Sequence, residues 1–254
     1  LFLQSKNPCI IMEFGDLRTG KSTIASHIIG GPCSDFSKTL FKTAGSSSSC
    51  TREINAVGPI KCRQIASAFG LTTDYNPNID RDIFIVDSEG LNAFDGETPW
   101  LMQALLAMLP INTVTLYVAK SINKNDLNQF MKYLKLIRVI GGMEIHHGLI
   151  YVNNQERFDG SNVIEQLIEQ NKRSTKYLID SFSQSSIQVD DSHFKCLSVL
   201  QFEKHKKEFF TSLKEIVKFI VDLCINDKAV LSGEMVVNML EEFVALPSDF
   251  EYNK

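Results

Sequence analysis

The sequence predicts an α/β fold with three layers, α/β/α, in which helices cover both faces of a mostly parallel central sheet. The first strand runs directly into a glycine-rich turn and then a helix. Segments with helical spacing of apolar residues separate the later strands, an alternation that is typical of parallel sheets. The strands themselves are expected from short apolar runs, the clearest of which are residues 9–14, 83–86, 113–118, 148–152 and 194–199.

The overall numbers fit a globular protein with one large domain. The chain has 254 residues, of which 44% are hydrophobic and 22% charged. We expect residues 1–225 to form the main domain and residues 226–254 a C-terminal helical extension packed on it or next to it. A net charge of −4 argues against nucleic acid as a partner. No apolar run is long enough to cross a bilayer.

The cysteines favour reduced thiols in a cytoplasmic protein. There are six of them, and none has the C-x-x-C spacing of a metal site. A disulfide framework is therefore not expected. The cysteines are Cys9, Cys33, Cys50, Cys62, Cys196 and Cys224.

The glycine-rich turn has the pattern of a P-loop. Residues 15–22 read G-x-x-x-x-G-K-S, after a strand that is apolar apart from Glu13 and before a helix from about 23 to 30. Its glycines let successive N–H groups face a polyphosphate, whereas Lys21 reaches the β- and γ-phosphates and Ser22 ligates Mg²⁺. The alternative is a chance turn before a helix. The residues expected to contact the nucleotide here are Gly15, Asp16, Leu17, Arg18, Thr19, Gly20, Lys21, Ser22 and Thr23. The fold expected is that of P-loop NTPases.

Two later segments have the features of nucleotide-sensing switches. Residues 33–50 are polar and contain a serine run, which predicts a flexible loop in the position of switch I. Thr51 closes this loop, before a strand that ends near residue 60, and would complete the Mg²⁺ shell and sense the γ-phosphate. The alternative for Thr51 is a solvated or capping threonine.

The second switch begins with D-x-x-G at the end of the strand 83–86. Asp87 would hold Mg²⁺ through water, and the N–H of Gly90 would contact the γ-phosphate. The alternative is an ordinary turn. Leu91 follows where Ras-type enzymes place a glutamine that positions water, so we expect slow intrinsic hydrolysis.

The base-binding end is expected at the ends of two later strands. The strand 148–152 is followed by Asn153 and Asn154, where GTPases carry an N/T-K-x-D tetrad. Glu156 can accept both guanine donors, whereas Asn154 lacks the stem and charge of the usual lysine. The alternative for Glu156 is a plain loop acid. Ser198, in the last strand, is expected to contact the base through its backbone.

The helices complete the expected order. Pro99 begins an amphipathic helix, and a polar connector is expected over 182–193. The last helix is expected to pack on the domain, with partner binding as the alternative. The helical segments are residues 99–109, 124–140, 161–180, 204–224 and 228–246.

The order of these motifs resembles P-loop GTPases of the TRAFAC class. Residues 15–22 and 87–91 look like the guanylate-binding proteins of the dynamin-like branch. In that family the P-loop arginine acts as an arginine finger once two GTPase domains pair. The resemblance implies that Arg18 is catalytic together with Lys21 and Thr51, and that the protein forms a nucleotide-dependent homodimer or homo-oligomer. The alternative for Arg18 is a solvated cation.

Other stretches are similar to the GTPases of immunity-associated proteins, which are relatives of the septins. These stretches are residues 20–30, 51–53 and 116–126, together with the altered tetrad at Asn153. This family assembles through its GTPase domains, often on membranes, which implies a cytoplasmic location with peripheral membrane association as a variant. The chain departs from this family at Arg18, and from the guanylate-binding pattern at the tetrad.

Three functions remain open at this point. The first is a Mg²⁺-dependent GTPase that hydrolyses GTP to GDP and phosphate, slowly unless assembled, and acts as an assembly switch. The second is an assembly module that binds GTP without hydrolysing it. The third is a P-loop ATPase or nucleotide kinase with relaxed base choice, prompted by the altered tetrad.

Overall fold

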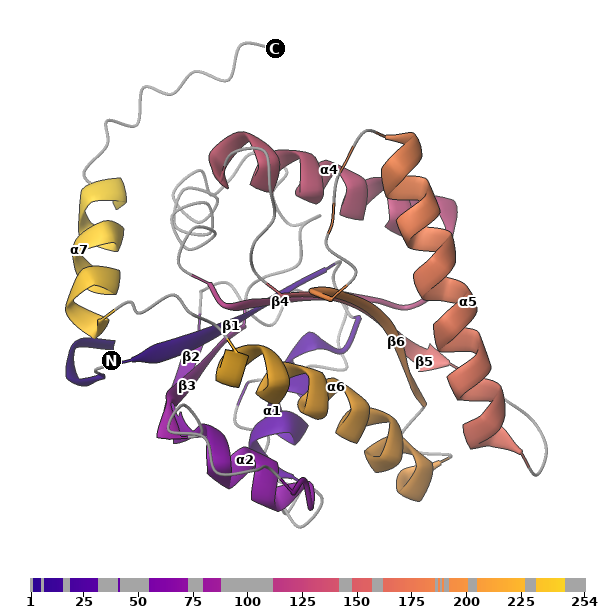
Figure 1. The fold of residues 1–254 in the computed structure, drawn as a ribbon, viewed down its shortest axis with the longest axis horizontal. Coiled ribbons are helices and arrows are strands. Elements are labelled where there is room, and N and C mark those ends of the chain that lie inside the picture. Colours follow the sequence, from indigo (N-terminus) through magenta and orange to yellow (C-terminus); the bar gives the residue numbers. More distant parts are fainter. Residues whose placement is uncertain are drawn as a thin grey trace.

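The protein has an α/β fold built on a six-stranded, mostly parallel mixed sheet with flanking helices (Figure 1). The computed structural model describes residues 2–5, 7–15, 19–31, 41, 55–72, 80–87, 112–141, 148–156, 162–185, 187, 189, 192–200, 205–226 and 232–244. The strand order is β2-β3-β1-β4-β5-β6. The strands are β1 (Pro8–Phe14), β2 (Asn55–Lys61), β3 (Asp82–Asp87), β4 (Val114–Ala119), β5 (Gly148–Glu156) and β6 (Phe194–Leu200).

The first strand lies in the middle of the sheet. β1 pairs in parallel with β3 on one side and with β4 on the other. Only the edge strand β2 runs antiparallel, and its pairing with β3 shifts register between Val57 and Ile60, around the Gly58–Pro59 bond. Proline cannot donate to a ladder, so this edge position suits it.

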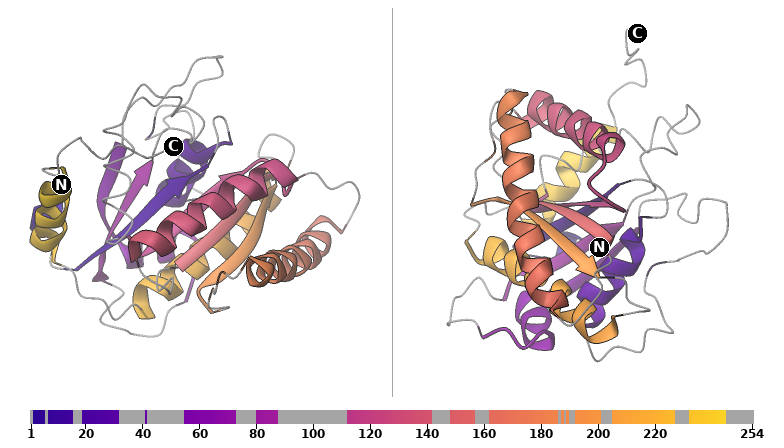
Figure 2. Two further views of the ribbon diagram at one scale, coloured as in Figure 1. Left: turned by 90° about the horizontal axis from the view of Figure 1, so that it is seen from above. Right: turned by 90° about the vertical axis from the view of Figure 1, so that its right-hand side faces the viewer.

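Helices cover both faces of the sheet (Figures 1 and 2). Cys9 and Ile11 of β1 pack with α1, α2 and α6, whereas Ile10 and Met12 pack with α4, α5 and α7. This alternation follows from the two-residue period of a strand. The described helices are η1 (Phe2–Gln4), α1 (Lys21–Gly30), α2 (Cys62–Ala68), α4 (Lys124–Gly141), α5 (Val163–Gln184), α6 (Lys206–Asn226) and α7 (Gly233–Val244).

The free edge of β6 is covered by side chains of α5. The Thr175 hydroxyl accepts the Cys196 N–H at 3.0 Å and donates to the Cys196 carbonyl at 3.3 Å. One turn earlier, Asn171 Oδ1 accepts the Ser198 N–H at 2.8 Å. These bonds occupy backbone groups that an edge strand otherwise offers to another chain.

The last of the described helices, α7, packs beside the N-terminal turn η1. The Gly233 N–H donates to the Ser5 carbonyl at 2.8 Å, and Val236 is buried in the cluster formed with α4 and α5. Helix α7 therefore packs against η1 and against the core cluster that includes α4 and α5. Among the described helices, none is both long and apolar enough to span a membrane.

Two predicted boundaries are wrong, and one helix was not predicted. β5 continues to Glu156 because Asn154 and Glu156 still pair with β6. α5 runs to Gln184, into the expected connector, because Phe182 is buried in the core. The short helix α2 was not expected, and it follows β2 without a loop. The helix expected over 99–109 and both switch segments lie outside the described residues, apart from Phe41 and Asp87.

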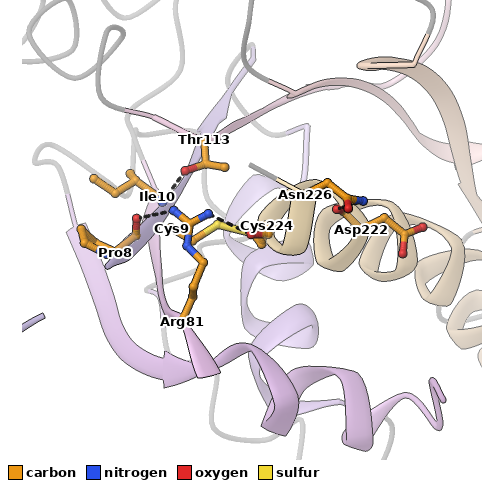
Figure 3. The surroundings of a disulfide bond; sticks show 8 residues. All are labelled: Pro8, Cys9, Ile10, Arg81, Thr113, Asp222, Cys224 and Asn226. Carbon is orange, nitrogen blue, oxygen red and sulfur yellow. Dashed lines mark hydrogen bonds between the residues drawn. A yellow bond between two sulfur atoms is a disulfide. The ribbon is translucent and has the colours of Figure 1, made fainter. Parts of the chain in front are cut away.

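The prediction of reduced cysteines is wrong for one pair. Cys9 of β1 and Cys224 of α6 form a disulfide, with Cα atoms 6.2 Å apart (Figure 3). The buried Arg81 lies beside it and donates to the carbonyls of Cys224 (2.8 Å) and Pro8 (3.0 Å). These two cysteines are 215 residues apart in sequence, so spacing gave no sign that packing α6 against β1 brings them together.

Candidate functional site

The candidate site lies at the carboxyl ends of the central strands. β3 and β4 flank β1 on opposite sides: the chain passes from β1 to β2 and β3 on one side, and then crosses from β3 to β4 on the other. In open α/β sheets, such a point of reversal leaves a crevice at the carboxyl ends of the strands where ligands bind. Gly15 follows β1 directly, and α1 begins at Lys21. The predicted phosphate loop therefore starts at this reversal point.

Two glycines of the loop have conformations that other residues rarely adopt. Gly15 has φ +139°, and a Cβ there would collide with the Val118 carbonyl of β4. Gly20 is the left-handed residue before α1, with φ +86°, and a Cβ there would collide with the Asn154 amide. Glycine is needed at both positions because it adopts positive φ without strain and has no Cβ atom to collide with these neighbours. The backbone can therefore pass close to its neighbours.

The start of α1 suits an anion. Within the described residues, no side chain caps the helix at Gly20. The first N–H groups of a helix and its dipole attract negative charge. Lys21 lies in this first turn, is 7% exposed, and its ammonium donates to the Gly15 carbonyl at 3.3 Å. The ammonium thus reaches back along the loop, and Thr23 lies half-buried in the same turn.

Ser22 and Asp87, the two residues predicted to hold a metal ion, are hydrogen-bonded to each other. The Ser22 hydroxyl donates to Asp87 Oδ2 at 2.6 Å. Asp87 is 1% exposed, and its Oδ1 has no hydrogen-bond partner among the described residues. Burial raises the pKa of Asp87, while the Ser22 hydrogen bond and the charge of Lys21 lower it in part.

These residues fit Mg²⁺. A hydroxyl and a carboxylate are hard oxygen ligands, and Mg²⁺ is usually held by one or two protein groups plus phosphates and water. The buried Asp87 Oδ1 is an acceptor that such an ion, or its water, would satisfy. No group of three or more His, Cys, Asp and Glu that could hold a metal by itself occurs among the described residues. An ion at this place would bind Ser22 and Asp87 together with phosphate oxygens or water.

Glu13 is a second buried carboxylate beside Asp87. It is 0% exposed in β1 and pairs in register with Asp87 of β3. Burial and the charge of Asp87 raise its pKa well above the usual range, and the charge of Lys21 lowers it. Sequence reasoning assigned Glu13 no role, although it is the only charged residue in an otherwise apolar strand.

The predicted base-binding end consists, among the described side chains, of buried amide and hydroxyl groups. The Asn154 amide donates to the Thr19 carbonyl at 2.6 Å, so this side chain contacts the phosphate loop. The Asn153 amide donates to the Ser198 hydroxyl at 3.4 Å, while the Ser198 N–H donates to Asn171. The structure thus joins β5, β6 and the loop at one place. The sequence did not predict the contact of Asn154 with Thr19 or the hydrogen bond of Asn171 with Ser198, because both depend on strand register.

The remaining predicted site residues are described only in part or not at all. Only the backbone of Glu156 is described, in β5 beside Leu200. Its proposed contact with a base stays a prediction, as does that of Ser198. The residues that lie outside the described part of the chain are Asp16, Leu17, Arg18, Thr51 and Gly90.

Comparison with known proteins adds no relative. No model of a known protein family matches the chain, and no curated protein sequence matches it significantly. The functional argument therefore depends on the residues and their geometry.

Proposed function

We propose that this protein binds a guanine nucleotide with Mg²⁺, hydrolyses GTP to GDP and phosphate, and acts as a nucleotide-dependent assembly switch. The observation that carries the proposal is the partly buried Ser22–Asp87 hydrogen bond at the reversal point of the sheet. A P-loop serine and an acid at the end of a neighbouring strand are the two protein groups that P-loop NTPases use to hold Mg²⁺.

The finer fold assignment, a P-loop NTPase fold, is part of this proposal. It is supported by the strand order β2-β3-β1-β4-β5-β6 with β2 antiparallel, combined with the left-handed Gly20 before α1. In this arrangement the glycine turn, Lys21 and Asp87 all lie at the carboxyl ends of β1 and β3.

Each described residue has a separate part in this scheme. The Lys21 ammonium and the first N–H groups of α1 bind and orient the phosphates. Ser22 and Asp87 would hold Mg²⁺, which when bound neutralises charge between the β- and γ-phosphates. Catalysis of this kind depends mostly on positioning and electrostatics. To residues outside the described part of the chain we assign two further roles. Arg18 would supply the positive charge that speeds hydrolysis, and Thr51 and Gly90 would contact the γ-phosphate.

Single-turnover phosphate release from GTP tests the hydrolysis. We expect slow release that requires Mg²⁺ and is lost in Asp87→Asn. The Asp82→Asn variant serves as a control, because that carboxylate lies at the far end of the same strand and pairs with Lys61. Tight GTP binding without phosphate release would favour the non-hydrolysing assembly module instead.

The dependence of the rate on protein concentration tests the assembly. If Arg18 acts only when two molecules pair, the rate per molecule rises with concentration in the wild type and stays flat in Arg18→Ala. An arginine finger is worth about 10³–10⁵ in rate, so the difference is large. A wild-type rate that does not change with concentration would contradict this part of the proposal.

One observation favours a second candidate, a P-loop NTPase with relaxed base choice. The Asn154 side chain, in the place of the tetrad lysine, is hydrogen-bonded to the loop, and its short amide has no stem to lie along a base. Competition between GTP and ATP, with and without Glu156→Ala, separates the two candidates. Equal affinities in the wild type would remove the guanine preference, whereas a preference lost in Glu156→Ala would support it.

A further inference from the structure

The end of β4 lies in the middle of the candidate site. β4 pairs with β1, which leads into the phosphate loop, and with β5, which carries Asn153 and Asn154. The Val118 carbonyl lies so close to Gly15 that a Cβ there would collide with it. One residue further on, Ala119 is the register partner of Asn153. The last residues of β4 therefore lie between the proposed phosphate end and the proposed base end.

Lys120 follows β4 directly, and its side chain is exposed. The six residues of β4 are all buried, so Lys120 is the residue at which the chain leaves the core. Within the described part of the chain, Lys120 makes no hydrogen bond and no ion pair. The next acidic residue in the sequence, Asp126, accepts a hydrogen bond from the Asn123 amide at 2.7 Å. The ammonium of Lys120 is therefore available to an anion.

The backbone on both sides of Lys120 is held in place. Before it, Ala119 belongs to the ladder with β5. After it, the Tyr151 hydroxyl donates to the Ser121 carbonyl at 3.1 Å, and the Asn123 amide donates to the Ser121 hydroxyl at 2.9 Å. A backbone that is already ordered reduces the entropy lost when a side chain binds a ligand. Lys120 thus presents its cation from a fixed point at the carboxyl edge of the sheet.

A nucleotide in this site would pass over the end of β4. The strand order places β4 between β1 and β5. Phosphates at the start of α1 and a base at the end of β5 would therefore lie on either side of it. The part of the ligand above β4 would be the sugar and the phosphate next to it. A lysine ammonium is a point charge on a flexible stem, which suits a phosphate.

We propose that Lys120 is a further nucleotide-binding residue, and that its ammonium binds the phosphate nearest the sugar. This inference rests on the proposed nucleotide binding and deepens it. Asn154, in the place of the tetrad lysine, is uncharged and bonded to the Thr19 carbonyl. Lys120 therefore brings a positive charge to the part of the site where the altered tetrad supplies none.

Calorimetric titration with GDP at low and at high salt tests the proposal. In Lys120→Gln, which removes the charge, we expect GDP affinity to fall about fivefold at low salt, the value of one exposed charge contact. The loss should shrink at high salt, because exposed charges are screened. GMP has only the phosphate nearest the sugar, so its affinity should fall by the same factor as that of GDP.

Two further variants separate the charge from other effects. Lys120→Arg keeps the charge and should bind GDP within about twofold of the wild type. Lys176→Gln is the matched control, because Lys176 is an exposed lysine of α5 that also makes no hydrogen bond or ion pair within the described part of the chain. It should bind GDP as the wild type does. Melting curves of all variants should coincide, since neither side chain is buried.

The possible failures are distinguishable. If Lys120→Gln binds GDP as tightly as the wild type does, Lys120 contacts only solvent and the inference is overturned. A loss that is independent of salt, that Lys120→Arg shares, or that is absent for GMP would also overturn it, because the charge would then not act on the phosphate nearest the sugar. If the wild type binds no nucleotide, the proposed function itself fails.

Discussion

The two ends of the candidate site, the proposed phosphate end at the start of α1 and the proposed base end at the ends of β5 and β6, differ in their chemistry. At the phosphate end, ionisable groups are buried together: Lys21, Asp87 and Glu13 lie around the start of α1. At the base end, the described side chains are neutral. Asn153, Asn154 and Ser198 bond to each other, to the loop and to α5.

This difference indicates where binding energy and selectivity come from. Hydrogen bonds to charged groups contribute more than neutral ones, so most of the affinity should depend on the phosphate end. Among the described residues, the base end mainly supports the loop, because Asn154 contacts Thr19. Variants at the two ends should therefore differ in size of effect and in dependence on the base.

The largest effect is expected from removing the buried ammonium. In Lys21→Met, which keeps most of the aliphatic stem, affinity for Mg²⁺–GDP should fall about 100-fold, because charge-assisted bonds to phosphate are worth about 1.5–3 kcal/mol. Calorimetry measures this loss, and melting curves check folding. Lys61→Met is the control, since its ammonium pairs with Asp82 far from the loop. A loss below threefold in Lys21→Met would contradict a charged phosphate end.

The stability of the protein should depend on pH through His27 of α1, the helix at the proposed phosphate end, because this side chain packs in an apolar environment. His27 packs edge-on against Phe209 and Phe210 of α6. Desolvation lowers its pKa to about 4. The imidazole of His27 is therefore protonated near pH 6.5 in the unfolded chain, but only near pH 4 in the folded chain. Because the unfolded chain binds this proton more tightly, the unfolding free energy falls as the pH falls from about 6.5 to about 4.

The variant His27→Phe removes the titratable imidazole and keeps an aromatic ring at this position. Between pH 7 and pH 4, the wild type should lose about 2–3 kcal/mol more of its unfolding free energy than the variant does. Urea unfolding at several pH values measures the difference. Parallel pH profiles in the two proteins would show that His27 titrates normally and that α1 is not anchored in this way.

An intermediate effect is expected where the two ends meet. Asn154→Ala removes the hydrogen bond to the Thr19 carbonyl, at a cost of about 1–2 kcal/mol. Affinity should fall about tenfold, and by the same factor for GDP and ADP, because the contact supports the loop. Parallel titrations with the two nucleotides measure it. A loss confined to GDP would instead make Asn154 a base reader and would break the comparison.

The smallest effect is expected at the last strand. The bond between Asn153 and the Ser198 hydroxyl is long, at 3.4 Å, so Ser198→Ala should cost less than about 1 kcal/mol. We expect at most a fivefold change in GDP affinity, with any change larger for GDP than for ADP. A greater loss that is equal for both nucleotides would place Ser198 among the supports of the loop.

The sequence predicted the phosphate end better than the base end. Gly15, Lys21, Ser22 and Asp87 follow from a local motif and one strand end, and the structure brings Ser22 and Asp87 together. At the base end, β5 was expected to stop before Asn153, but pairing with β6 extends it to Glu156. A strand end that depends on its neighbour cannot be read from the strand alone.

By itself, the sequence determined the alternation of strands and helices and the glycine turn before α1, because hydrophobic period and backbone conformation are local properties. Only the tertiary structure decided what lies across from what. It placed Glu13 in register with Asp87, joined Cys9 to Cys224 and set Asn154 against Thr19. These contacts arise from sheet order and helix packing, which bring together residues that are far apart in the chain.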